Sequence, residues 1–236
     1  MCAVRSDDEP PATRLVRVEE RDGLAAGLDA LGLRRGRPVV VLVGGAAVMA
    51  AEDRALVADV MRRSVFPLLA RFDAVVVDGG TDSGVMRVAG RARAAGGDRF
   101  SLVGVVARGT VGDDLGALEP FHTHVLLVPG SEWGDESPWL VDVASVLADG
   151  APTVTLVVNG GAITYDDIRR SLDAGRPVVV LAGTGRAADA VAAASAGRTS
   201  NTDAARGAAS PLTSVVDIRD HEAVSAMLVS ALASRP

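Results

Sequence analysis

Glycine-rich segments follow several valine-rich runs of this 236-residue sequence, and they carry groups that can bind phosphate. Glycine tolerates positive φ and lets the backbone approach a ligand, and the free N–H groups at a helix start attract an anion. Neighbouring hydroxyl groups can cap the helix or donate to a phosphate oxygen. The candidates are Gly44, Gly45, Gly79, Gly80, Thr81, Ser83, Gly84, Gly160, Gly161, Thr164, Gly183, Thr184, Gly185 and Arg186.

A single glycine pair in such a segment is equally well explained as a tight connection between a strand and a helix. Four such segments at corresponding strand ends favour a shared site, because ligands of open parallel sheets bind beyond the carboxyl ends of the strands. Arg186 stands at a predicted helix start and could pair with a phosphate through two N–H groups; the alternative is a solvated surface arginine. Arg108 could add positive charge to the same crevice, although an ordinary exposed loop arginine is the preferred interpretation.

Other polar residues give weaker signals. His122 and His124 are separated by one residue, and with no acidic or cysteine partner at a helpful spacing we interpret them as a structural or capping pair and predict no metal site. Further along, a tryptophan, Trp133 or Trp139, could stack on an adenine, and a carboxylate, Glu132 or Asp135, could accept ribose hydroxyl groups. A tryptophan in a turn equally often anchors the packing of a helix.

The elements that would position these residues follow from the hydrophobic pattern. Strands buried on both faces read as continuous valine-rich runs, and helical patterns separate the runs of this chain. We therefore predict an α/β, Rossmann-like fold with a mostly parallel sheet of about seven strands and helices on both faces. The predicted strands are Pro38 to Val43, Ala74 to Val77, Leu102 to Ala107, His124 to Val128, Thr153 to Val158, Pro177 to Ala182 and Ser214 to Ile218, with Arg14 to Val18 at an edge.

The segments between these strands are predicted to be helical, with one exception. The helices are Asp22 to Leu33, Glu52 to Arg71, Ser83 to Ala95, Ser137 to Ala148, Tyr165 to Ala174, Arg186 to Ala196 and Asp220 to Ala233. Between Gly197 and Pro211 the residues are mostly small and polar without periodicity, which predicts a mobile surface loop.

Composition limits the class of protein. Hydrophobic residues make up 48% of the chain, enough for one core, so we predict a disordered tail over residues 1–12 and a single domain over residues 13–236. No apolar run reaches the ~18 residues that span a bilayer. The net charge of -6 argues against general nucleic-acid binding. A lone cysteine, Cys2, and the lack of a signal-sequence pattern favour a soluble, cytoplasmic protein.

Three stretches of the sequence resemble a known family. They are LVGGAAVM with FDAVVVDGGTDSGVMRVAG, then LEPFHTHVLLVPG, and then TLVVNGGAITYDDIRRSLDAGRPVVVLAGTGRAAD. In order and spacing they are similar to the amino-terminal homology region of TRPM-type channels, and so to the prokaryotic TRPM-like (LSDAT) branch of the SLOG superfamily. The resemblance covers about Arg14 to Ala194, and nothing resembles the channel's transmembrane region.

The resemblance implies a Rossmann-like fold that recognises nucleotide-derived ligands, of the ADP-ribose type in the channels. It places the ligand phosphates on the residues that match the channel turn, which are Gly80, Thr81, Gly84 and Val85. The match at Gly183, Gly185 and Arg186 implies a second side of the pocket.

Enzymatic members of the wider superfamily, the LOG-type phosphoribohydrolases, carry a P-G-G-x-G-T-x-x-E segment that residues 159–167 resemble. Here Asn159 replaces the proline, Ile163 replaces a glycine, and Asp167 replaces the glutamate, so Asp167 is a weak catalytic candidate. A bulky side chain where the backbone must approach phosphate, and a shorter acid, both argue against hydrolysis.

From these observations we predict a sensor or binding domain for a nucleotide-derived ligand that is ADP-ribose-like, NAD-derived or a cyclic nucleotide, with no resident cofactor. The anionic group should lie at the start of the helix near Ser83. The alternative is a LOG-like nucleotide N-glycoside hydrolase, and a purely structural oligomerisation domain would not need the glycine turns. An apolar stripe of Val224, Leu228 and Leu232 could support a homo-oligomer or could simply cover the sheet.

Overall fold

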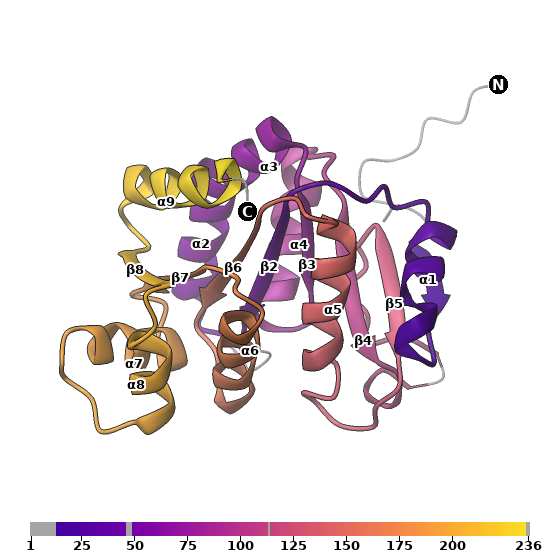
Figure 1. Ribbon diagram of the computed structural model, residues 1–236. Helices are drawn as coiled ribbons and strands as arrows, with labels where there is room; N and C mark the ends of the chain where they lie inside the picture. The colour runs from indigo at the N-terminus through magenta and orange to yellow at the C-terminus, as the bar shows by residue number, and fades with distance from the viewer. Residues whose placement is uncertain (1–12, 46–48, 113, 235–236) are drawn as a thin grey trace.

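The computed structural model describes residues 13–45, 49–112 and 114–234, which form one eight-stranded sheet with helices on both faces (Figure 1). Every pair of neighbouring strands is parallel, and the order is β1-β5-β4-β3-β2-β6-β7-β8. The strands are β1 (Arg14–Arg17), β2 (Val39–Gly44), β3 (Val75–Asp78), β4 (Leu102–Ala107), β5 (His124–Val128), β6 (Thr153–Val158), β7 (Val178–Ala182) and β8 (Thr213–Asp217). The predicted fold class is confirmed, with β1 at an edge as expected. The predicted tail and Cys2 lie outside the described residues.

Alternate residues of each central strand face opposite sides, which gives a large hydrophobic core on each face of the sheet, and a smaller third cluster contains Val106, Val111, Val125 and Leu127. On β2, Val40 and Leu42 belong to one core, and Val39, Val41 and Val43 belong to the other. Both sets are almost fully buried, which explains why these strands read as continuous valine runs.

Helices α2 (Ala51–Val60), α3 (Phe66–Phe72), α4 (Gly84–Gly96) and α9 (His221–Ala233) cover one face of the sheet. Helices α1 (Leu24–Ala30), α5 (Ser137–Ala148), α6 (Ala162–Asp173), α7 (Arg186–Ser195) and α8 (Thr202–Ala208) cover the other. Short helical turns η1 (Arg21–Gly23) and η3 (Arg108–Thr110) follow β1 and β4. In the part of the chain that the structure describes, no helix has the length and apolar character needed to cross a membrane.

Two helical predictions need correction. The single helix predicted over Glu52 to Arg71 is divided by a π-helical segment, η2 (Met61–Val65), because Pro67 in the first turn of α3 has no N–H to donate to the preceding turn. The loop predicted between Gly197 and Pro211 contains α8. Asn201 caps it by accepting a hydrogen bond from the Ala204 N–H at 2.9 Å, and Ala204 is buried in the core.

The predicted self-association surface also needs a new interpretation. Val224, Leu228 and Leu232 of α9 are at most 2% exposed and belong to the core cluster that contains β2, β6 and β7 residues. The stripe therefore covers the sheet, which was the alternative interpretation, and it lends no support to a homo-oligomer.

Candidate functional site

The strands that precede the four glycine-rich segments are neighbours in the sheet. β3, β2, β6 and β7 lie side by side in that order, and all are parallel, so the four turns meet at one edge. From β2 the chain proceeds outward through β3 and β4, whereas β6, on the other side of β2, leads outward to β7 and β8. Such a switch point opens a crevice between two neighbouring strand ends, and ligands of open α/β sheets bind there.

A cavity of about 490 Å³ occupies this position. Its size is within the range of small-molecule sites, roughly 300–1,000 Å³. It is lined by Leu42, Val43, Gly44, Gly45, Gly79, Ser83, Met86, Trp133, Glu136, Leu140, Gly161, Ala162, Ile163, Thr164, Asp167 and Arg186. The structure thus brings together nine of the predicted residues, namely Gly44, Gly45, Gly79, Ser83, Trp133, Gly161, Thr164, Asp167 and Arg186.

Arg186 supplies positive charge to the cavity from the start of α7. A Cβ atom at Gly161 would lie 3.0 Å from Arg186 Nη2, and one at Gly45 would lie 3.2 Å from Arg186 Nη1. The guanidinium group therefore rests against both glycine backbones, which explains why side chains are absent there. Within the described residues Arg186 forms no ion pair, and its side chain is exposed, so its N–H groups are available to an anion.

The turn between β3 and α4 contributes Gly79 and Ser83 to the cavity, together with Met86 from the first turn of the helix. Ser83 is the N-cap residue of α4, but its hydroxyl group bonds to the Thr81 hydroxyl at 3.1 Å and does not cap the helix. The first N–H groups of a helix have no partner inside it. The start of α4 therefore offers uncapped donors and a positive partial charge beside the cavity.

The other residues of this turn lie behind the cavity wall and do not line the cavity. Thr81 and Val85 are buried, and neither they nor Gly80 and Gly84 line the cavity. Gly80 has a φ of 63°, and a Cβ there would lie 2.8 Å from the Cα of Gly104, so β4 packs directly against the turn. The four residues on which the resemblance places the phosphates thus lie behind the cavity wall, whereas Gly79, Ser83 and Met86 form it.

The turns after β6 and β7 are tied to each other. The Asn159 N–H donates to the Thr184 hydroxyl at 2.7 Å, and the Thr184 hydroxyl donates to the Leu181 carbonyl at 2.7 Å. Gly160 has a φ of 105° and packs against Thr164. Gly160, Gly183, Thr184 and Gly185 are outside the cavity lining, so their contribution is to hold Gly161 and Arg186 in place.

Two carboxylates lie on the α5 and α6 side of the cavity. Asp167 is 8% exposed and its Oδ1 atom has no hydrogen-bond partner; burial, with the charges of Glu136 and Asp166 adding to it, raises its pKa to about 7. Burial also raises the pKa of Glu136, which accepts a hydrogen bond from the Gly134 N–H at 3.0 Å. Trp133, 50% exposed, stands beside them as an apolar wall.

Two predicted contributors lie elsewhere. Arg108 forms an exposed ion pair with Glu19 at 2.7 Å, away from the cavity lining, in keeping with the preferred interpretation of an ordinary surface arginine. Asp135 accepts hydrogen bonds from the Ser131 and Glu132 N–H groups, which hold its pKa below the usual value, and it stabilises its own loop.

The residues that the sequence did not reveal are Leu42, Val43, Met86, Glu136, Leu140, Ala162 and Ile163. Most are apolar positions at strand or helix ends, which look the same in the sequence whether they face a cavity or a core. Glu136 stands just before a predicted helix but does not cap it, so its position in the sequence gave no sign that it faces a cavity.

The chain is similar to a protein family and to solved structures. The family model described as SLOG in TRPM, prokaryote, matches residues 37–226. No curated protein matches. Among solved structures, the X-ray structure of TM1055, a structural genomics target, is similar with 23% identity and a TM-score of 0.47, covering 65% of this chain and 78% of that one. The family match includes all four glycine-rich turns, and the chain belongs to the prokaryotic branch of the SLOG domains found in TRPM.

Proposed function

We propose that this domain binds a nucleotide-derived ligand of the ADP-ribose class in the cavity at the β2–β6 switch point, and that it acts as a sensor. The observation that carries the proposal is the arrangement of charged side chains on the walls of the cavity. Arg186, which has no carboxylate partner among the residues that the structure describes, lies against two glycine backbones, and two carboxylates lie on other walls of the same cavity. A ligand with a phosphate and several hydroxyl groups is complementary to that lining.

The anionic part of the ligand fits the arginine and the start of α4. Arg186 has free N–H groups, and the uncapped helix start next to Ser83 adds donors and partial positive charge. Gly45, Gly79 and Gly161 supply backbone without side chains along this wall, so phosphate oxygens can come close to main-chain N–H groups.

The sugar and base fit the rest of the cavity. Asp167 and Glu136 line the cavity and carry carboxylate oxygens of the kind that accept hydrogen bonds from ribose hydroxyl groups. The exposed Trp133 ring at the rim offers a stacking face for a purine. Hydrolysis receives less support, because the acid at position 167 is an aspartate and Ile163 occupies the position of a glycine in the hydrolases.

The proposal is tested by thermal shift and calorimetry with ADP-ribose, cyclic ADP-ribose, NAD and AMP. We expect one of these to stabilise the protein, and Arg186→Gln to weaken its binding at least tenfold, because a hydrogen bond to a charged group contributes about 1.5–3 kcal/mol. Arg198→Gln is the matched control, since Arg198 is exposed and outside the cavity lining. Its affinity should equal that of the wild type.

A glycine substitution tests the backbone wall. A Cβ at Gly79 would meet only the Met86 side chain, at 3.7 Å, and the φ of Gly79 is not positive, so Gly79→Ala should fold normally and weaken binding. Gly84 is a poorer target, because its φ of 48° makes any side chain strained. If none of the four compounds shifts the melting temperature, or if both variants bind like the wild type, the proposed function is wrong.

A further inference from the structure

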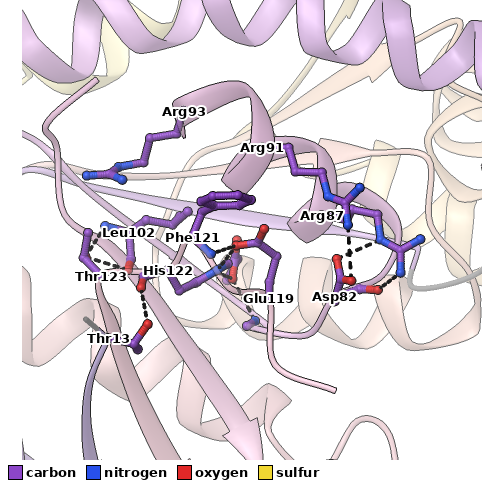
Figure 2. Close-up of polar contacts among 12 residues, drawn as sticks. Thr13, Asp82, Arg87, Arg91, Arg93, Leu102, Glu119, Phe121, His122 and Thr123 are labelled. Carbon is purple, nitrogen blue, oxygen red and sulfur yellow. Dashed lines mark hydrogen bonds and ion pairs between the residues drawn. The ribbon is translucent and has the colours of Figure 1, made fainter. Parts of the chain in front are cut away.

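A histidine between two carboxylates is buried behind the turn that forms one wall of the cavity. His122, Asp78 and Glu119 are each at most 1% exposed, and none lines the cavity. His122 Nε2 lies 2.7 Å from Asp78 Oδ1, and His122 Nδ1 lies 2.8 Å from Glu119 Oε2. Figure 2 shows the Glu119 and His122 side chains meeting, apart from the surface ion pairs of Asp82 with Arg87 and Arg91.

The geometry fixes the number of protons in this cluster. Each hydrogen bond needs one proton, and carboxylate oxygens only accept, so two hydrogen bonds between three groups require two protons. If both protons are on the ring, His122 is an imidazolium cation between two anions. Burial opposes this charged form, but the charges and hydrogen bonds of Asp78 and Glu119 outweigh it and raise the pKa of His122 to about 9.

The groups around the cluster favour the charged form. Asp78 faces His122 from β3 and Glu119 from the segment before β5, and α4 contributes Arg93, whose charge interacts with Glu119. Arg93 also interacts with Asp98, and the groups that favour the charged form of His122 are Asp78 and Glu119. The cluster is also tightly enclosed, since a Cβ at Gly90 of α4 would lie 2.0 Å from Glu119 Oε2 and one at Gly104 of β4 would lie 3.2 Å from the His122 ring.

Each carboxylate of the cluster also accepts a backbone hydrogen bond. Asp78 accepts one from the cavity turn, and Glu119 accepts one from the segment that precedes β5. Asp78 accepts the Gly80 N–H at 2.8 Å, and Glu119 accepts the Phe121 N–H at 2.9 Å. The Glu119 N–H in turn donates to the Gly80 carbonyl at 3.0 Å, and the Asp82 N–H donates to the Ala117 carbonyl at 2.8 Å. Residues 117–122 thereby form a brace behind the turn that runs from Gly79 to Ser83.

We propose that His122 is a positioning residue of the binding cavity: as a buried imidazolium that donates to Asp78 and Glu119, it fixes the Gly79–Ser83 turn against which the ligand's anionic group lies. This inference rests on the proposed function. His122 touches no ligand, because it has no exposed surface and lies outside the cavity lining. It acts on the turn indirectly, because it donates to Asp78, and Asp78 accepts the hydrogen bond of the Gly80 N–H.

The first test needs no ligand. The chain has three histidines, so ring signals in ¹H–¹⁵N spectra can be assigned with His122→Gln and His124→Gln. We expect His122 to carry protons on both ring nitrogens at pH 7.5. His124 is the control, because burial, assisted by the charges of Arg14 and Arg93, lowers its pKa to about 4 and leaves it neutral. A neutral His122 ring at pH 7.5 overturns the proposal.

The second test follows hydrogen exchange of the Gly80 and Asp82 amides between pH 7 and 10, corrected for intrinsic rates. In the wild type we expect their protection to fall at least tenfold as pH rises through about 9, where His122 loses its proton. Glu119→Gln and Asp78→Asn keep an acceptor oxygen but remove a negative charge, so each should move this midpoint down by at least one pH unit. His124→Gln should leave it unchanged.

A purely structural cluster would behave differently, because loss of packing lowers protection at every pH without moving a midpoint. An unchanged midpoint in both carboxamide variants therefore overturns the proposal, even if His122→Gln fails to fold. Calorimetry with ADP-ribose completes the test, and its affinity should fall over the same pH range and shift in the same variants. If ADP-ribose does not bind at all, the proposed ligand is wrong, whereas the ligand-free measurements still decide the role of His122.

Discussion

Two charged side chains that line the cavity, Arg186 and Asp167, have polar atoms without an ion-pair or hydrogen-bond partner among the described residues. Arg186 has no carboxylate partner within the described residues, and Asp167 has a buried oxygen without a donor. An unsatisfied buried polar atom such as Asp167 Oδ1 destabilises the native state by about 1–3 kcal/mol, whereas the Arg186 side chain is exposed and carries no such cost. Both residues nevertheless lie on the walls of one cavity.

Asp167 gives a prediction about pH. Its pKa rises from 3.8 in the unfolded chain to about 7 in the fold, so between these values the native state holds a proton that the unfolded state has lost. The free energy of unfolding should therefore decrease as pH rises from 4 to 7, by up to about 4 kcal/mol at roughly 1.4 kcal/mol per pH unit. Asp167→Asn cannot ionise, so urea unfolding should find it more stable than the wild type at pH 8. Equal pH dependence in the two proteins would contradict this.

The sequence predicted the types of residue near the cavity better than it predicted which individual residues line it. Glycine, hydroxyl groups and arginine at four strand ends were sufficient to predict the sheet edge at which the cavity lies, because parallel strands direct their carboxyl ends to one edge. Which glycines line the cavity was not predictable. Gly80 has the same local pattern as Gly79, and only the packing of Gly104 on β4 against Gly80 places it behind the wall.

At the scale of elements, regular patterns were predictable and contacts between elements were not. The apolar runs predicted seven strands, and Arg14 to Val18 was a separate candidate for the edge. The short helix α8 was not predicted, because it depends on the Asn201 cap and on the packing of Ala204, and seven residues are too few for a periodic signal. The brace behind the β3–α4 turn is likewise invisible in the sequence, because Asp78 and His122 are 44 positions apart.

The close packing of helix α4 against the brace of residues 117–122 leads to a prediction about stability. Replacing glycine by alanine inside a helix normally stabilises it by about 1 kcal/mol. At Gly90 the new Cβ would lie 2.0 Å from a carboxylate oxygen of Glu119, which His122 holds in place, so we expect Gly90→Ala to lower the free energy of unfolding by about 1–3 kcal/mol.

Gly96→Ala is the control in the same helix. There the nearest atom belongs to the end of the Asp98 side chain, which is less buried than Glu119 and can move, so the change should be within about 0.5 kcal/mol. Urea unfolding measures both variants. A Gly90→Ala protein as stable as the wild type would show that α4 is not packed tightly on the brace.

On the scale of the whole molecule, the position of the cavity follows from the strand order. The chain builds β2 to β4 on one side of the switch point and β6 to β8 on the other, and the cavity is lined from both sides, by Gly45 and Gly79 on the first and by Gly161 and Arg186 on the second. A ligand bound there would contact both parts of the sheet. The order itself was not predictable from the sequence, because β5 and β1 fill the far edge through pairings between distant segments.

The last prediction separates a core role of α9 from a role in association. Leu228 is 1% exposed in the core on this side of the sheet, so Leu228→Ala should lower the free energy of unfolding by about 2–5 kcal/mol, through lost burial and the cavity that remains. Ser230→Ala, on the exposed side of the same helix, should change it by less than about 0.5 kcal/mol. Light scattering at micromolar concentration should give the wild-type mass for both variants. If Leu228→Ala instead lowers the mass and leaves the unfolding of the subunit unchanged, α9 packs against a second copy of the chain and its assignment to the core is wrong.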